Sequence, residues 1–193
     1  MHADEGLRER LIRVGGELLD NEGPSRVSLR EIARHAGVSH GAPRRYFPTH
    51  LELLSAIARD GFTDLAARAN STLTGTTGDH PRARLAALAR VYLDFAATRR
   101  GRYELMFRHD LLESGHLGLR ELSLPLFRLL TDLVAQARPE PEPPAEVVAA
   151  ALWANLHGLA QLWNWGSLTL ATGATDPDVL LDATLTAHLG PAA

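Results

Sequence analysis

Hydrophobic residues recur at helical spacing along nearly the whole chain. Leu29, Ile32, Ala33 and Ala36, for example, stand at positions i, i+3, i+4 and i+7, so one face of a helix there is apolar. No stretch shows the alternation of apolar and polar residues that is typical of a half-buried strand. The pattern therefore predicts an all-α fold of about nine helices. The expected helices cover residues 7–21, 28–36, 39–47, 50–70, 81–100, 101–112, 119–137, 144–170 and 176–189.

Start and stop signals frame two short helices near the N-terminus. Ser28, followed three residues later by Glu31, is typical of a capping box, and Gly37 ends the first of these helices. Ser39 can cap the second, which ends before Pro48 because proline lacks a backbone donor. A helix, a glycine turn and a short helix are the layout of a helix-turn-helix, whose second helix enters the DNA major groove.

The charge of this region supports the same interpretation. Residues 24–50 hold five arginines and one acid, a local balance of +4, while the whole chain sums to −3. A basic island on an acidic protein is expected where a protein contacts DNA. Most charge runs are only solvated helix faces. Here the coincidence of charge, caps and turn favours DNA contact.

The last two expected helices are unusually apolar. Residues 144–170 carry hydrophobic side chains on nearly every face, and a helix of that kind in a soluble protein must be covered on several sides. The final helix adds a stripe of leucines. Two such helices can pair with their copies across a two-fold axis and form a four-helix bundle. The sequence thus predicts a homodimer through the last two helices.

The segment 38–54, VSHGAPRRYFPTHLELL, resembles the recognition helix and the start of the next helix in TetR-type transcriptional regulators. The helix over 7–21 and the segment SLREIARHAG match that family's first two helices, so the resemblance covers roughly the first quarter to third of the chain. Arg44 stands where the family often has an aromatic residue. His50 stands where a lysine commonly helps to hold a phosphate, and Pro43 removes one backbone bond from the recognition helix.

The resemblance implies a helix-turn-helix DNA-binding domain over 1–50 and a helical ligand-binding and dimerisation domain over 51–193. It also implies a bacterial transcription regulator, a repressor, that binds double-stranded operator DNA as a homodimer. In this family a bound small molecule moves the helix expected over 50–70, the recognition helices separate and operator affinity falls. The dimer would place its two recognition helices about one DNA turn apart, roughly 34–36 Å.

Nine residues are predicted DNA contacts. Side chains on the early turns of a recognition helix reach base edges, and arginine pairs well with guanine. The expected base contacts are His40, Ala42, Pro43 and Arg44, with Arg44 as the guanine reader. The expected phosphate contacts, which position the protein without reading sequence, are Ser28, Ser39, Arg45, Tyr46 and His50. Phe47 is predicted to lie in the core.

Nine further side chains could line an apolar cavity with a few polar handles, as in a small-molecule site. They are Phe62, Tyr92, Phe95, Tyr103, Met106, Phe107, Trp153, His157 and Trp163. Core packing accounts for each of them singly, while the resemblance favours a largely apolar effector for the set. His157 is a candidate polar handle because a buried imidazole needs a hydrogen-bond partner.

Two patterns resemble sites of other kinds. Residues 37–41, GVSHG, match the G-x-S-x-G nucleophile elbow, but that motif needs a preceding strand and a helix is expected here. The protein is therefore not predicted to be an enzyme, and no cofactor is expected. His109 and Glu113 lie four residues apart and could hold a metal with His116. A solvated helix end explains these three residues equally well, so no metal site is predicted and the question stays open.

Composition limits the location and the remaining alternatives. The chain has no cysteine, and all 20 of its basic residues are arginine, which suggests a GC-rich bacterial genome. Neither a signal peptide nor a membrane span is expected, so the predicted location is the cytoplasm, on the nucleoid when bound to DNA. One alternative is a DNA-binding dimer without an effector. Another is a small helical enzyme using the central cavity, although no complete catalytic set can be assembled.

Overall fold

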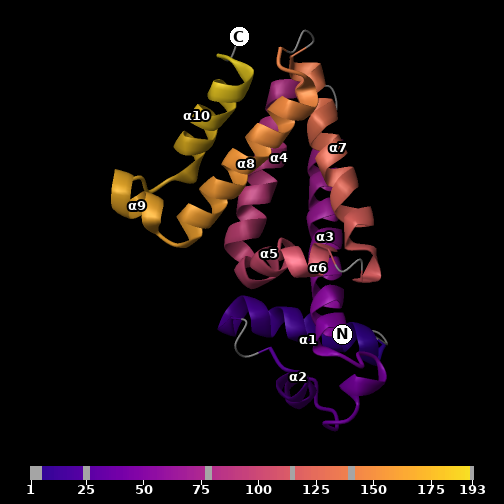
Figure 1. The fold of residues 1–193 in the computed structure, drawn as a ribbon. Coiled ribbons are helices and arrows are strands. Elements are labelled where there is room, and N and C mark those ends of the chain that lie inside the picture. The colour runs from indigo at the N-terminus through magenta and orange to yellow at the C-terminus, as the bar shows by residue number, and fades with distance from the viewer. Residues whose placement is uncertain (1–5, 24–26, 77–79, 114–115, 139–141, 192–193) are drawn as a thin grey trace. The chain divides into compact units, whose positions relative to one another are not determined.

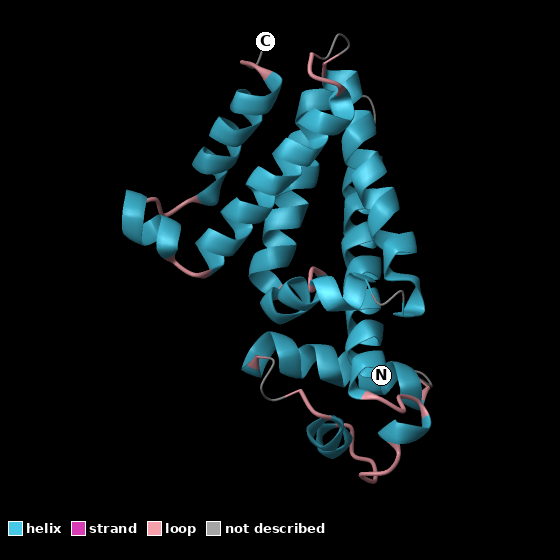
Figure 2. Ribbon diagram, viewed as in Figure 1, coloured by secondary structure: helices cyan, strands magenta, loops and turns pink. Residues whose placement is uncertain are grey.

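The computed structural model describes residues 6–23, 27–76, 80–113, 116–138 and 142–191, apart from the side chain of His116. Within these ranges the regular structure is ten α-helices and two 3-10 helices, with no strand (Figures 1 and 2). The predicted all-α fold is confirmed. The chain packs as two compact units, one formed by residues 1–64 and 98–122, the other by 65–97 and 123–193.

Unit 1 contains the N-terminal helices and a segment from the middle of the chain. Its elements are α1 (Leu7–Glu22), α2 (Leu29–His35), the 3-10 helix η2 (Pro43–Arg45), the first part of α3 (His50–Gly75), α5 (Arg100–Met106), α6 (His109–Glu113) and the 3-10 helix η3 (His116–Gly118). Apolar side chains on the facing sides of these helices form its core. Fully buried members include Leu11, Ile32, Phe47, Leu53, Ile57 and Tyr103.

Unit 2 is a bundle of longer helices. It contains the rest of α3, then α4 (Pro81–Thr98), α7 (Leu119–Ala137) beyond its first residues, α8 (Ala145–Asn164), α9 (Ser167–Thr172) and α10 (Pro177–Leu189). Asp176 caps α10 by accepting a hydrogen bond from the backbone N–H of Asp178, 2.9 Å away, as an N-cap should. The core of this unit includes Leu85, Val134, Leu152, Leu156 and Leu181.

Three of the expected helices differ in the structure. The prediction of a helix over 39–47 is wrong, because the chain forms only the short η2 there. Pro43 has no N–H, so the Ser39 carbonyl accepts instead from Ala42, 3.0 Å away, and Arg45 bonds back to Ala42 at 3.2 Å. These i to i−3 bonds are typical of a 3-10 turn.

The two longer expected helices are each divided, which raises the number of α-helices to ten. The helix expected over 144–170 ends at Asn164, because Gly166 adopts a left-handed φ of 74° and α9 begins after it. The helix expected over 101–112 is interrupted at Phe107, where φ is −101° and ψ is 12°. The ring of Phe107 contacts those of Phe62 and Tyr103, so tertiary packing decides this break.

A buried arginine on α5 ties three segments of unit 1 together. Arg102 Nε lies 3.2 Å from an Asp20 carboxylate oxygen at the end of α1, and Arg102 Nη1 lies 3.2 Å from Asp60 on α3. Its backbone N–H also donates to Asp20, at 2.9 Å. The close approach of α5 to α1 depends on two glycines. A Cβ on Gly16 would overlap the Arg102 guanidinium, and a Cβ on Gly101 would overlap the backbone of α1.

Burial raises the pKa of the Asp20 carboxyl above its ordinary 3.8, although the hydrogen bond and charge of Arg102 pull it down. Burial likewise raises the pKa of Asp60, against the charge of Arg102. Both groups therefore take up protons more readily in the folded chain than in the unfolded one. Their contribution to stability is full below pH 3.8 and is lost as pH rises through the raised folded values.

We expect Arg102→Met to lower the free energy of unfolding by about 3–5 kcal/mol at neutral pH, because the buried Asp20 carboxylate loses its counter-charge. The penalty should shrink as pH falls through the raised carboxyl pKa, since a protonated Asp20 needs no counter-charge. Urea unfolding over a pH series measures both effects. Glu17→Gln, which removes the exposed Arg13–Glu17 pair at 3.0 Å, is the control and should cost at most ~1 kcal/mol. A penalty for Arg102→Met that does not change with pH would contradict the account.

Candidate nucleic-acid interface

The first helix of the expected helix-turn-helix forms as its signals predict. The Ser28 side chain accepts a hydrogen bond from the Glu31 N–H at 3.2 Å, which confirms the N-cap of α2. Ile32 and Ala33 are buried, so the apolar face packs inward. Gly37 has φ 68° and turns the chain out of the helix, as a glycine at this position can.

The segment after that turn is anchored at two buried points. Pro43 is buried and Phe47 is only 1% exposed, which confirms Phe47 as core, and the Phe47 N–H bonds to the Pro43 carbonyl at 2.8 Å. Between these anchors Arg44, Arg45 and Tyr46 are all exposed. The chain thus presents two guanidinium groups and a phenol on a short, pinned stretch of backbone.

The N-terminus of α3 follows directly. Thr49 caps the helix, accepting from the Glu52 N–H at 3.2 Å. The next residue, His50, has its Nε2 atom 2.9 Å from the Val27 carbonyl oxygen. Because a carbonyl only accepts, Nε2 must carry the proton. A donated bond from His50 to a phosphate would therefore need a second proton, on Nδ1, and so a charged ring.

The nine predicted DNA contacts fall into two groups. Pro43 is buried, so it presents no apolar surface to a base. Ala42 is half-buried. The other seven side chains are exposed: Ser28, Ser39, His40, Arg44, Arg45, Tyr46 and His50. All nine belong to unit 1. Their roles as DNA contacts stay predictions.

A further cation lies beside this segment and carries no signal in the sequence. The guanidinium of Arg8, in the first turn of α1, lies over the Phe47 ring, 5.5 Å from its centroid. Residues 8 and 47 are brought together only by the packing of unit 1. Of the other cations in the basic island, Arg34 donates to Glu31 at 2.8 Å, which partly neutralises it, and Arg26 lies outside the described residues.

The nine predicted ligand contacts are divided between the two units. Phe62, Tyr103, Met106 and Phe107 lie in unit 1, where the ring centroids of Phe62 and Phe107 are 5.8 Å apart. The members in unit 2 are Tyr92, Phe95, Trp153, His157 and Trp163. Four of the nine, Phe62, Phe95, Tyr103 and Met106, are at most 1% exposed.

Two polar groups of this set meet inside unit 2. The Tyr92 hydroxyl and His157 Nδ1 are 2.8 Å apart, so the predicted polar handle has a partner within the chain. Burial lowers the pKa of His157 below its ordinary value of 6.5. The ring is thus held neutral over a wider pH range, in which Nδ1 can accept a hydrogen bond from the Tyr92 hydroxyl.

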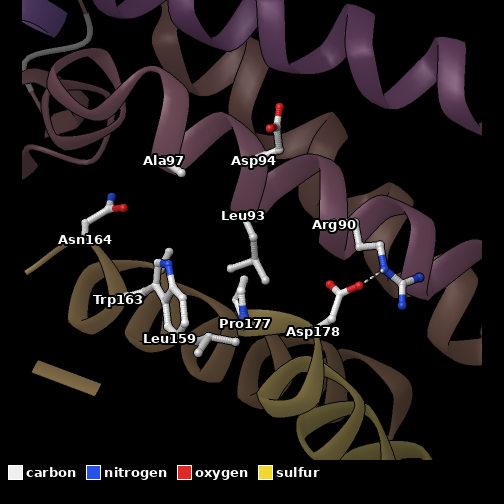
Figure 3. Close-up of a pocket in the computed structure, with 10 residues that line it drawn as sticks. Arg90, Leu93, Asp94, Ala97, Leu159, Trp163, Asn164, Pro177 and Asp178 are labelled. Atoms are coloured by element: carbon white, nitrogen blue, oxygen red, sulfur yellow. Dashed lines mark hydrogen bonds and ion pairs between the residues drawn. The ribbon is translucent and has the colours of Figure 1, made fainter. Parts of the chain in front are cut away.

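A pocket of about 290 Å³ lies elsewhere in unit 2, between α4, α8 and α10 (Figure 3). Trp163 is the one predicted ligand contact among its lining residues. The other lining side chains, among them Leu93, Leu159 and Asn164, were not predicted. They come from three helices that are distant in sequence, and no local pattern marks them.

The patterns that suggested other chemistry form no assembled site in the part of the chain that is described. His109 and Glu113 make an exposed ion pair at 3.3 Å, and the side chain of His116 lies outside that part. No three His, Cys, Asp or Glu side chains there are grouped as metal ligands. The GVSHG stretch follows a helix, α2, instead of the strand that a nucleophile elbow needs. No described helix is long and apolar enough to cross a membrane.

Comparison with known proteins matches both halves of the chain. Residues 11–57 match the model of bacterial regulatory proteins of the tetR family, and residues 85–188 match that of the tetracyclin repressor-like C-terminal domain. An HTH-type transcriptional regulator of Mycobacterium tuberculosis is 30% identical over 105 residues, which are 54% of this chain and 45% of that protein. The match therefore spans about half the length of this curated relative.

Solved structures agree over the whole chain. A protein of unknown function from Rhodococcus sp. RHA1 superimposes with a TM-score of 0.83 at 29% identity, covering 97% of this chain and 96% of that one. A transcriptional regulator from the same organism gives a TM-score of 0.68 at 25% identity, covering 95% and 94%. With the C-terminal model alone matching more than half of its residues, the chain belongs to the TetR family of bacterial transcriptional regulators.

Proposed function

We propose that this protein is a homodimeric repressor that reads operator DNA through residues 39–50 and is released by a small molecule. The observation that carries the proposal is the pinned segment between Pro43 and Phe47, which exposes Arg44, Arg45 and Tyr46 together. The protein would act in the bacterial cytoplasm and would not be an enzyme. DNA binding is assigned to residues 1–50, and ligand binding and dimerisation to 51–193.

The exposed groups divide by chemistry. Arg44 can pair with guanine O6 and N7, while Arg45, Tyr46 and the two serines Ser28 and Ser39 suit phosphate oxygens. We add Arg8 to the phosphate contacts, because its guanidinium lies at the Phe47 end of the same segment. This set combines base reading with the non-specific attraction that dominates affinity for DNA.

Exposed apolar side chains support dimerisation through α8 and α10. Six of the nine large hydrophobic side chains that the described residues leave exposed lie between residues 147 and 179: Val147, Trp153, Leu162, Trp165, Leu170 and Val179. Leu170 is 90% exposed and Val179 67%. Large apolar side chains left exposed on neighbouring helices support an interface there, and a two-fold axis lets the same surface pair with its copy.

Release by a ligand is supported by the chain's connectivity. Helix α3 begins next to the DNA-reading segment and continues from unit 1 into unit 2 without a break. A ligand that binds one arrangement of unit 2 more tightly would shift the population of α3 positions, and operator affinity would fall. A DNA-binding dimer with no effector remains the second candidate, and the absence of any ligand that changes DNA affinity would favour it.

We expect Arg44→Ala and Arg45→Ala to weaken DNA binding in different ways. Arg44→Ala should cost about 1–3 kcal/mol at one base pair and relax discrimination there. Arg45→Ala should weaken binding to all sequences alike and reduce the salt dependence by about one counterion. Fluorescence anisotropy with the promoter fragment beside the protein's own gene, at several salt concentrations and against a random duplex, separates the two effects.

Arg128→Ala supplies the control for both variants, because Arg128 is an exposed arginine on α7 in unit 2. Its removal should leave the affinity and the salt dependence close to those of the wild type. Equal losses in Arg44→Ala and Arg128→Ala would argue against a DNA-reading role for residues 39–50.

The dimer is tested by placing a charge on α8. Leu162→Glu should convert the dimer to a monomer, because a carboxylate cannot be covered by the apolar partner surface without a large desolvation cost. Light scattering after size exclusion reports the mass. Leu124→Glu on α7 is the matched control, since Leu124 is 41% exposed and Leu162 is 39% exposed. A wild type that is monomeric, or a Leu162→Glu variant that stays dimeric, would refute the proposed interface.

A further inference from the structure

The pocket of about 290 Å³ between α4, α8 and α10 has apolar walls and charged groups at part of its rim. Leu93 from α4, Pro177 at the start of α10 and Trp163 from α8 point toward one another across it (Figure 3). Small side chains at Ala97 and Ala160 leave the space that larger residues would fill. Its volume is at the lower end of the range for small-molecule sites.

The charged groups at the rim are already matched with each other. Arg90 Nε lies 3.1 Å from Asp178, and Arg90 Nη2 lies 3.8 Å from Asp182. Asp94 lies 3.5 Å from Arg68, and its carboxylate is directed away from the apolar side chains in Figure 3. A charged ligand would give up its hydration among apolar walls and would meet only groups that have a counter-charge.

The remaining lining groups suit an uncharged aromatic molecule. The indole of Trp163 offers a ring face for stacking, and Leu93 and Leu159 supply aliphatic contact. Asn164 provides an uncharged amide at one end, and its own nitrogen donates to the Ala96 carbonyl at 2.8 Å, which orients the group. Apolar walls with a few placed polar groups are what small-molecule sites share.

We propose that this pocket is a binding site for an uncharged aromatic molecule. The inference deepens the proposed ligand response and rests on it for its regulatory meaning. It places the ligand against α4, α8 and α10, where only one of the nine predicted ligand contacts, Trp163, lines the site.

The test is a fluorescence titration of the full chain, without DNA, using N-phenyl-1-naphthylamine. Its matched counterpart, 8-anilinonaphthalene-1-sulfonate, has the same ring skeleton with a negative charge. We expect saturable binding of the neutral dye at one site per chain, and binding of the sulfonate at least about tenfold weaker. Failure of this titration and failure of DNA binding are distinguishable, because no DNA is present.

Two variants test whether the dye binds in the pocket. Ala97→Leu adds a larger side chain at an exposed rim position, where folding should be unaffected, and Trp163→Leu removes the stacking face. Each should raise the dissociation constant of the neutral dye about tenfold or more. Ala87→Leu makes the same change on α4 outside the pocket lining and should leave the constant within about twofold.

If the neutral dye binds Ala97→Leu and Trp163→Leu as tightly as it binds the wild type, the pocket is not its binding site. Such dye would be adsorbed on the exposed apolar surface of α8 to α10 instead. Equal affinity for the two dyes would contradict the proposal that the ligand is uncharged. If Trp163→Leu fails to fold, as judged by circular dichroism, Ala97→Leu decides.

Discussion

The burial of Pro43 and Phe47 is the constraint on which the proposed DNA-reading segment depends. Fully burying a side chain such as that of Phe47 contributes about 1.5–3 kcal/mol and fixes one end of the segment, while the buried Pro43 fixes the other. With its ends held, the backbone between them has little freedom. Arg44, Arg45 and Tyr46 therefore point outward as a set, although no long recognition helix supports them.

The segment 98–122 supplies a second constraint. It packs in unit 1 although it follows α4 of unit 2 in sequence, and Arg102 joins it to Asp20 and Asp60. The chain passes between the units at three points, after residues 64, 97 and 122. Helix α3 spans the first of these with long stretches in both units, whereas α4 and α7 cross the other two close to their ends, so α3 is the longest helical connection between the proposed ligand-binding and DNA-reading parts. A helix can carry a displacement along its length where a loop would absorb it.

Local signals in the sequence predicted where several helices begin, whereas no local signal predicted the tertiary contacts. Ser28, Pro81 and Asp176 start helices where the sequence places them, because caps and proline act through neighbouring residues. The loss of regular helix after Ser39 could have been anticipated from Pro43, whose missing donor is visible in the sequence. The break at Phe107 could not, since it depends on ring packing within unit 1.

The candidate sites show the same limit. Seven of the nine predicted DNA contacts are exposed, whereas the burial of Pro43 was not predicted. The neighbouring Arg8 is 39 positions from Phe47 in sequence and is brought there only by the fold. The pocket at Trp163 combines residues of α4, α8 and α10, each with an ordinary helical pattern. The predicted ligand contacts were chosen mainly for their aromatic character, and the fold divides them between the two units.

Selection of bound duplexes from a random DNA pool tests the central claim most directly. A dimer with two recognition segments predicts an enriched palindrome whose half-sites are centred about 10 base pairs apart, or a multiple of that spacing. Sequencing of the bound fraction reads both the motif and its symmetry. Enrichment of such a palindrome is the result that the account predicts. A pool that stays random after several rounds, at a salt concentration where the protein still binds DNA, would contradict sequence reading by residues 39–50.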